Sequence, residues 1–168
     1  MMKTITPPAA DISRVLVREL ETLQREIALF PDDESVWRTL PGVTNSAGNL
    51  AMHVAGNLRH FVGATLGQTG YVRDRPTEFS RRSGTRADVI AELQEAIVAV
   101  QGTLSHISPE RWQAEYPIAV GDVHATTALY MLHFCAHAAF HLGQVDYLRR
   151  VLTGENRAAG AVDVQPLA

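Results

Sequence analysis

The chain contains a single cysteine, Cys135, among its 168 residues. One cysteine cannot form an intramolecular disulfide, so the sequence excludes a disulfide-stapled secreted domain and favours a cytoplasmic protein in a reducing compartment. The first residues, MMKTITPPAADISRVL, lack the apolar core of a secretion signal. No stretch approaches the roughly 20 apolar residues of a membrane-spanning helix. We therefore expect no membrane partner.

The sequence also lacks a strong charge of either sign. Its formal net charge is -3 with neutral histidines, and no basic patch is present, so a nucleic-acid partner is not expected. Hydrophobic residues make up 46% of the chain, which favours a globular fold over disorder. We predict one domain over residues 1–168, a size that supports a full core. The small residues of about 155–168 are expected to form a tail on the surface or on a neighbour.

Four long segments carry apolar residues at steps of three or four, the spacing of amphipathic helices. Prolines, glycines and N-capping residues mark their ends. The stretch 67–84 is expected to be a long loop, and 111–127 a short strand or extended loop. These features predict an all-α, up-down-type four-helix bundle with a short extended segment before the last helix. The helices are expected at about 9–30, 45–67, 85–104 and 126–152.

Three of the seven histidines lie in the stretch HFCAHAAFHLGQ, which ends at Gln144. Residues four apart on a helix lie on nearly the same side, so His133, His137 and His141 form a column that Gln144 extends. The outer two are about 12 Å apart along the axis, at 1.5 Å per residue, and are too distant to bind one ion together. One adjacent pair is therefore the candidate ligand pair, and the spacing leaves open which pair it is.

A third ligand must come from another segment, and the second predicted helix offers His53, with Asn57 and His60 on the same side. His53 lies in the apolar run NLAMHVAGNL, where an ionisable side chain is costly to bury unless it is paired or ligated. Three neutral imidazoles with an open position match a catalytic zinc or nickel site better than a closed structural one. The alternative is that the histidines are polar side chains satisfied by packing. Cys135 lies off the column and is expected to be a small buried residue.

The stretches NSAGNLAMHVAGNLRHFVG and HAAFHLGQVDYLRR, with RDRPTEF at 73–79, resemble the DinB/YfiT-like superfamily of metal-dependent four-helix-bundle proteins. The closer similarity is to its uncharacterised bacterial branch, and it covers most of the chain, through about Arg150. In that superfamily, one histidine of the second helix and two of the last helix hold the metal. The resemblance therefore implies His53, His137 and His141 as the metal ligands.

Understood members of this superfamily include S-transferases and isomerases that use mycothiol, bacillithiol or glutathione-like thiols, so the resemblance implies a low-molecular-weight thiol as a partner. A metal suits such chemistry because it lowers the pKa of a bound thiol or water. No HExxH glutamate accompanies the histidines. The candidate catalytic residues are His60, for proton transfer, and Gln144, for binding a metal-bound water or orienting the site. Arg59, Arg73 and Arg75 are either charges at a pocket mouth or ordinary solvated side chains.

Three hypotheses follow. The first is a metal-dependent enzyme, a thiol-dependent S-transferase or a hydrolase, with an open metal position facing a pocket. The second is a non-catalytic metal- or ligand-binding stress-response protein with the same site and no pocket for an organic substrate. The third is a structural bundle in which the histidines only pack. The resemblance disfavours the third, and it also implies a homodimer formed through helix faces.

Overall fold

Helices make up the regular structure of residues 8–167, the part of the chain that this computed structural model describes. Extended pairing within that part is limited to two isolated bridges, Glu115–Thr126 and Val120–Val123. The prediction of an all-helical fold is therefore confirmed. Residues 1–7, which begin the stretch inspected for a secretion signal, lie outside the described residues. The helices are α1 (Ala9–Ala28), α2 (Ala47–Leu58), α3 (Arg75–Ser80), α4 (Arg86–Leu104), α5 (Pro109–Gln113) and α6 (Thr127–Thr153).

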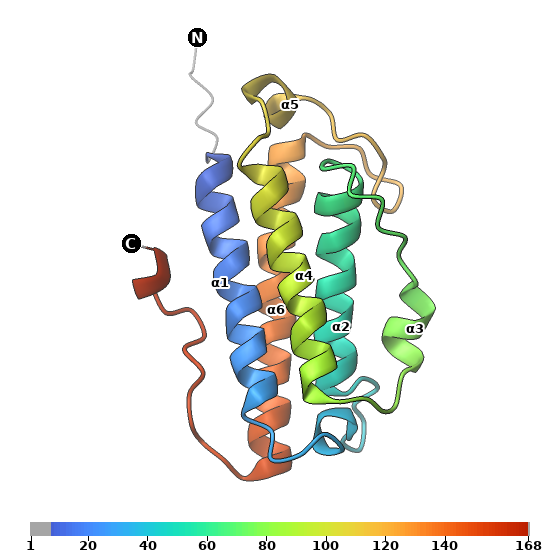
Figure 1. Cartoon of the computed structure of the whole chain (residues 1–168), viewed down its shortest axis with the longest axis vertical. Helices are drawn as coiled ribbons and strands as arrows, with labels where there is room; N and C mark the ends of the chain where they lie inside the picture. The colour runs from blue at the N-terminus through green and yellow to red at the C-terminus, as the bar shows by residue number, and fades with distance from the viewer. Residues whose placement is uncertain (1–7, 168) are drawn as a thin grey trace.

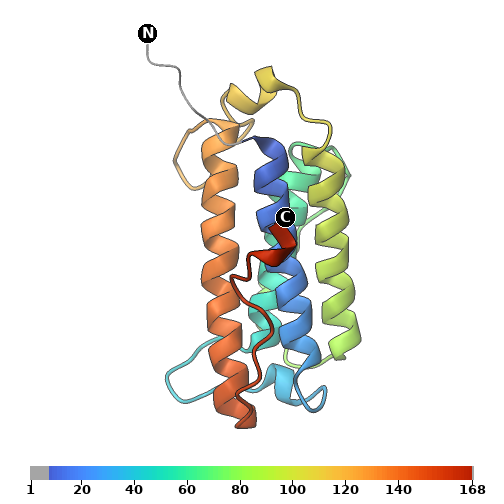
Figure 2. The same cartoon turned by 90° about the vertical axis from the view of Figure 1, so that its left-hand side faces the viewer.

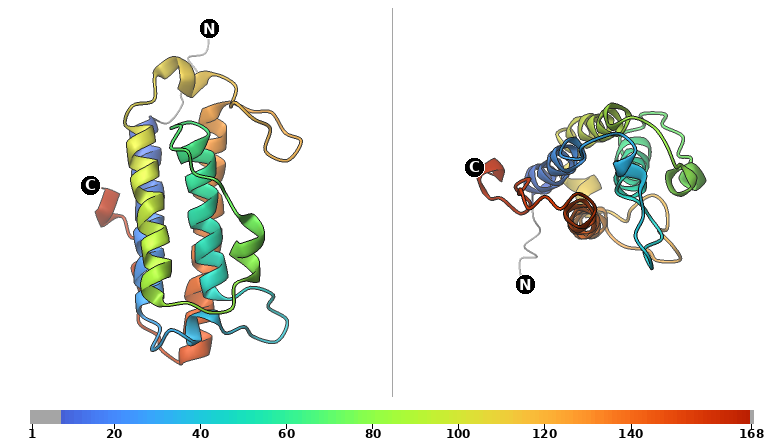
Figure 3. Two further views of the ribbon diagram at one scale, coloured as in Figure 1. Left: turned by 45° about the vertical axis from the view of Figure 1, so that its right-hand side comes forward. Right: turned by 90° about the horizontal axis from the view of Figure 1, so that it is seen from below.

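The four long helices α1, α2, α4 and α6 lie side by side around a shared apolar core (Figure 1; Figure 3). α1 packs against α4 and α6, and α2 packs against the same two helices from the opposite side. Each long helix turns apolar residues inward, as their spacing predicts, and α6 also exposes large apolar side chains, among them Leu132 and Phe140. None of the helices in the described residues has the length and apolarity that a membrane span requires. Core residues include Leu16, Leu20, Leu23, Val54, Leu58, Leu93, Val100, Met131, Phe134 and Ala138.

The order of helix directions differs from the alternating up-down order that we expected. The connection after α2 runs back along the outside of the bundle, so α4 starts at the same end as α2 and the two helices are parallel (Figure 1). Gly63 therefore lies beside Ala99, and Gly67 beside Thr103. The reason is the length of this connection, which spans the whole bundle and packs its own helix, α3, against α2.

Local capping chemistry sets the helix ends. Ser46 Oγ accepts from the Asn49 backbone N–H while the Asn49 side chain accepts from the Ser46 N–H, which starts α2 with a capping box. Thr85 and Asp88 form the same arrangement at the start of α4. α6 ends at Gly154, whose φ of 72° is left-handed and suits glycine. These ends agree with the predicted ones because capping depends on near neighbours in the sequence.

Three stretches differ from the sequence-based expectation. The expected loop 67–84 contains α3, which Asp74 caps by accepting from the Thr77 backbone N–H. The expected extended stretch 111–127 begins inside α5, and only the two bridges pair in it. The last turns of the second predicted helix, Arg59–Ala64, wind as a π-helix. Such local widening of a helix is frequent at functional sites.

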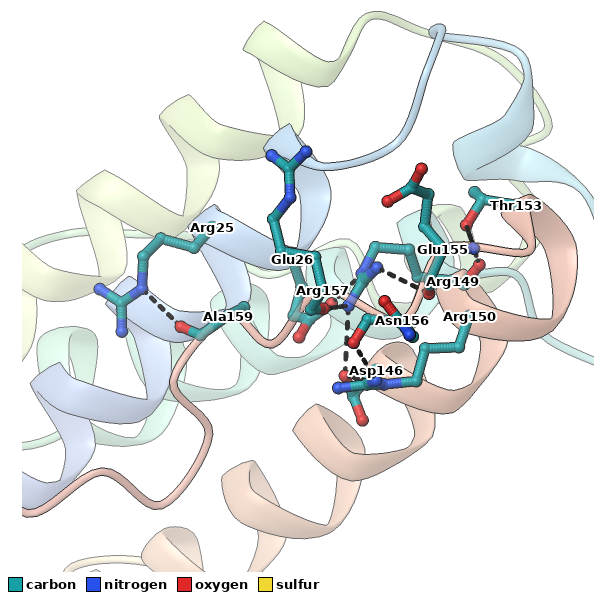
Figure 4. A network of polar contacts seen from close by, with 10 residues as sticks. All are labelled: Arg25, Glu26, Asp146, Arg149, Arg150, Thr153, Glu155, Asn156, Arg157 and Ala159. Carbon is teal, nitrogen blue, oxygen red and sulfur yellow. Dashed lines mark hydrogen bonds and ion pairs between the residues drawn. The ribbon is translucent and has the colours of Figure 1, made fainter.

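The C-terminal segment lies on its own chain, along α1 and α6 (Figure 2). Its main anchor is Arg149, which is fully buried, pairs with the buried Glu26 and donates to the Arg157 carbonyl at 2.6 Å (Figure 4). Arg25 Nε donates to the Ala159 carbonyl at 2.8 Å. Guanidinium groups of the bundle thus hold the backbone carbonyls of this segment, whose Val162 and Val164 remain exposed.

Candidate metal centre

The side chains of His53, His137 and His141 converge where α2 and α6 pass each other. His137 Nε2 lies 3.2 Å from His53 Nε2 and 3.1 Å from His141 Nε2. The potential ligand atoms of the three residues all lie within 4.8 Å of one another. α2 and α6 run in opposite directions (Figure 1), and the His53 ring of α2 lies 5.1 Å from the rings of both His137 and His141, which are one turn apart on α6. The three histidines are therefore close enough to hold a metal ion.

The nitrogen spacing fits a single ion. Two nitrogens that each lie 2.0–2.1 Å from a tetrahedral zinc are about 3.3 Å apart, close to the two measured separations of 3.1 and 3.2 Å. Hydrogen bonding among the rings accounts for the spacing less well. His137 Nε2 carries at most one proton, and it faces the Nε2 atoms of both His53 and His141. The contacts of the Nδ1 atoms of His53 and His141 favour tautomers in which these two Nε2 atoms carry lone pairs.

Two oxygen atoms outside the cluster, Glu78 Oε2 and Gln144 Oε1, favour one tautomer of His53 and of His141. His53 Nδ1 lies 2.9 Å from Glu78 Oε2, so Nδ1–H donates to this carboxylate, and in the neutral tautomer that this contact selects the lone pair lies on Nε2. His141 Nδ1 lies 2.7 Å from Gln144 Oε1, so the same tautomer applies there. Such outer partners orient metal-binding imidazoles and make them more basic. The site therefore presents converging lone pairs, which a cation satisfies.

The ring of His137 is neutral at ordinary pH. Burial is the main cause that lowers the pKa of His137, to about 3, and His141, His53 and His133 add to the effect. Burial also lowers the pKa of His141, against a hydrogen bond to Gln144 that raises it. Neutral imidazoles are the form that binds a metal.

Glu78, on α3, is a site residue that the sequence reasoning missed. Its carboxylate is 5% exposed and accepts from Arg73 Nε at 2.6 Å and from Arg73 Nη2 at 2.8 Å. Burial opposes its ionisation, but the hydrogen bonds from His53 and Arg73 outweigh burial, so the pKa of the Glu78 carboxyl lies below its usual value. Arg73 Nη2 also comes within 3.2 Å of His53 Nδ1 because both groups donate to the same oxygen. The Arg73–Glu78 ion pair thus supports the position of His53.

The GNLAMHVAGNLR stretch brings α3 and its glutamate to this place. The Asn49 amide donates to the backbone carbonyls of Glu78 and Arg81, both at 2.9 Å, which ties the end of α3 to α2. At Gly56, an added Cβ would lie 2.2 Å from Glu78 Oε1. Only glycine leaves room for the carboxylate against α2. These contacts give the Gly-Asn pattern around His53 a physical reason.

A pocket of about 530 Å³ adjoins the centre and shares a wall with it. His141 and Gln144 form that wall, and the loop 40–45 lies opposite. The volume is within the range of roughly 300–1,000 Å³ that is typical of small-molecule sites. An organic ligand in this pocket would contact His141, one of the three histidines. The lining residues are Leu40, Gly42, Val43, Thr44, Asn45, Leu50, His141, Gln144, Tyr147, Leu148 and Val151.

Other predicted residues lie at different distances from the centre. His133 is exposed and stacks on His137 with ring centroids 6.2 Å apart, so it lies outside the set of three. The His60 ring packs on Phe61 at 4.7 Å, and no hydrogen bond within residues 8–167 joins it to the three histidines. Burial, then the charge of Arg73, lowers the pKa of His60. Cys135 is buried as expected, and burial raises the pKa of its thiol to about 12.

The three arginines considered for a pocket mouth are engaged elsewhere. Arg73 is held by Glu78, as described above. Arg59 pairs with Glu92 and lies 4.1 Å over the Tyr71 ring. Arg75 lies 5.1 Å over the ring of Phe79. None of the three lines the pocket.

The fold and the site together define an all-helical protein with three histidines arranged to hold a metal. The chain belongs to the family described as "Protein of unknown function (DUF1572)", whose model matches residues 10–162. A search of curated proteins found no match. The family match covers both histidine-bearing helices and α3, so the whole candidate site lies within it.

Proposed function

We propose that this protein is a metal-dependent enzyme with the DinB/YfiT-like four-helix-bundle fold. His53, His137 and His141 hold one divalent ion, zinc or nickel, and leave a coordination position open to the pocket. The observation that carries the proposal is the convergence of three imidazole nitrogens beside a cavity of about 530 Å³. The free, buried Cys135 is compatible with work in the reducing cytosol.

A divalent ion at this position supplies the Lewis acidity that makes a thiol or a water molecule nucleophilic at neutral pH. The reaction class we propose is therefore thiol-dependent group transfer or hydrolysis. Glu78 accepts from His53 Nδ1–H, and Gln144 accepts from His141 Nδ1–H. These contacts hold the two imidazoles in the tautomer whose Nε2 can bind the metal. His60 is the proposed proton acceptor; burial, and then the charge of Arg73, lower the pKa of its ring.

The alternative is a protein that binds a metal or a small ligand without turnover. That hypothesis expects the same histidines but no cavity for an organic substrate. The pocket whose wall includes His141 and Gln144 therefore favours the enzyme. A purely structural bundle is disfavoured because packing alone does not account for ligand atoms of three histidines that all lie within 4.8 Å of one another.

Metal content of untagged protein, measured by mass spectrometry, tests the metal centre. We expect about one ion per chain in the wild type and loss of that ion in His137→Ala. His133→Ala is the matched control, because this histidine lies one turn away on α6 and stacks on His137. It should keep the metal. Equal zinc affinity of the His137→Ala and His133→Ala variants would overturn the proposal.

We also propose that two copies pair through the outward face of α6. Phe140 and Tyr147 are 63% and 72% exposed there, and the face carries no charged side chain. An outward helix face normally carries charge, and a contiguous exposed apolar patch marks a site of protein–protein interaction. Ala136 and Gly143 flank Phe140, so an antiparallel second copy can seat its own phenylalanine there. The face consists of Leu129, Leu132, Ala136, Phe140 and Gly143, and it ends at Tyr147 and Val151, which also line the pocket.

A further inference from the structure

The wall of the pocket beside the metal centre is mostly apolar and carries no formal charge. Six of its residues have large apolar side chains or rings, and none carries a formal charge. Tyr147 and Val151 of α6 face the loop residues Leu40 and Val43 across it. Its polar groups are the side chains of Thr44, Asn45, His141, Gln144 and the Tyr147 hydroxyl. Apolar walls with a few placed polar groups are typical of sites for small organic ligands.

We propose that this pocket binds an uncharged organic substrate with an apolar body. The inference rests on the proposed function, because it assigns the substrate of the same metal centre. Burying a carboxylate without a cationic partner costs several kcal/mol, in order of magnitude. Away from the proposed metal, the side chains that line the pocket offer no such partner, so a ligand whose far end carries a carboxylate is a poor occupant of it.

The arginines near the centre do not alter this conclusion. Both guanidinium donors of Arg73 that face the site are used by Glu78, and Arg59 is paired with Glu92. Recruiting either arginine for a substrate anion would leave a partly or fully buried carboxylate without its partner. The charge of these two arginines is therefore already committed within the protein, and the proposed metal is left to bind only the head group of a ligand.

Gln144 supplies the polar contact that an uncharged substrate needs. Its Oε1 accepts from His141 Nδ1–H, and its amide N–H donors have no partner among the described residues. A neutral acceptor such as a carbonyl oxygen can therefore bind Gln144 while it lies next to the metal ligands. Gln144 is then a positioning residue for His141 and a specificity residue for the substrate.

Two metal-binding probes of equal chain length test the inference. Octanohydroxamate ends in a methyl group, and suberate monohydroxamate ends in a carboxylate. Both are titrated against the cobalt-loaded protein, with the visible absorption of cobalt as the readout. We expect octanohydroxamate to bind at least tenfold more tightly. Val43→Lys, in the pocket wall, should narrow or reverse that preference, whereas Val98→Lys, an exposed valine of α4 outside the pocket, should not.

The outcomes separate this inference from the proposed function. Equal affinities of the two probes, each with a change in the cobalt spectrum, would overturn the apolar pocket and leave the open metal site standing. A cobalt spectrum that neither probe changes would show that no position is open, and would overturn both. If Val98→Lys changed the ratio of the two probe affinities as much as Val43→Lys does, the discrimination between the methyl and carboxylate ends would not come from this pocket.

Discussion

Gly56→Ala is expected to weaken the metal site although it removes no functional group. Gly56 lies on α2 against Glu78, and an added Cβ would be 2.2 Å from Oε1 and 3.0 Å from Cδ of that carboxylate. Carbon and oxygen atoms do not pack at 2.2 Å, so the carboxylate must move away. Its movement breaks the hydrogen bond of 2.9 Å to His53 Nδ1.

The size of the effect follows from the role of Glu78. Loss of a carboxylate that supports a metal-binding histidine typically lowers metal affinity by about 10–100-fold. At about 1.4 kcal/mol per factor of ten, this is about 1.4–2.8 kcal/mol of binding free energy. Glu78→Gln should fall in the same range, because the neutral amide is a weaker acceptor for the imidazole N–H.

A competition titration against a chromophoric zinc chelator measures this affinity. Gly102→Ala is the matched control: it lies in α4, and its added Cβ meets no atom within 4 Å. It should leave zinc affinity unchanged and raise the free energy of unfolding by about 0.4–1 kcal/mol. Wild-type zinc affinity in Gly56→Ala would show that the Glu78–His53 contact does not support the site, and would refute the reasoning.

Three further predictions concern the rest of the molecule. Cys135 should react with a thiol reagent at pH 8 only after unfolding, because its raised pKa of about 12 leaves almost no thiolate; fast reaction of the folded protein would contradict this. Arg149→Met should lower the free energy of unfolding in urea by about 3–5 kcal/mol, because it leaves Glu26 buried without its partner; a loss below about 1 kcal/mol would contradict the role of that pair. Phe140→Glu should give monomers in sedimentation velocity, whereas Val98→Glu, an equally drastic change on α4, should leave a dimer; a wild type that is monomeric at every concentration would end the dimer proposal.

Much of the helix content followed from the sequence because its causes are local. The apolar spacing and the caps at Ser46, Thr85 and Gly154 depend on residues within a turn or two, and the structure agrees with them. The short helix α3 was missed because six residues with several charges carry too weak a periodic signal. The Asp-Arg-Pro-Thr start was the available clue, since Asp and an early proline favour a helix N-terminus.

In the candidate site, too, local sequence patterns predicted only part of the arrangement. Spacing on one helix left two histidine pairs possible, and the resemblance chose 137 and 141. The structure brings His53 to that pair because α2 passes α6 at their level, while His133 remains exposed one turn away. Helical periodicity places residues on a face, but it does not say which turns of two helices meet.

The sequence by itself determined the helices, their buried faces and the histidine column, because these depend on contacts between residues a few positions apart. Only the tertiary structure decided that α4 runs parallel to α2 and that Glu78 supports His53 (Figure 3). It also decided that the pocket wall carries no formal charge. These features join residues from different elements, and the packing of whole helices positions them. No local pattern in the chain encodes that packing.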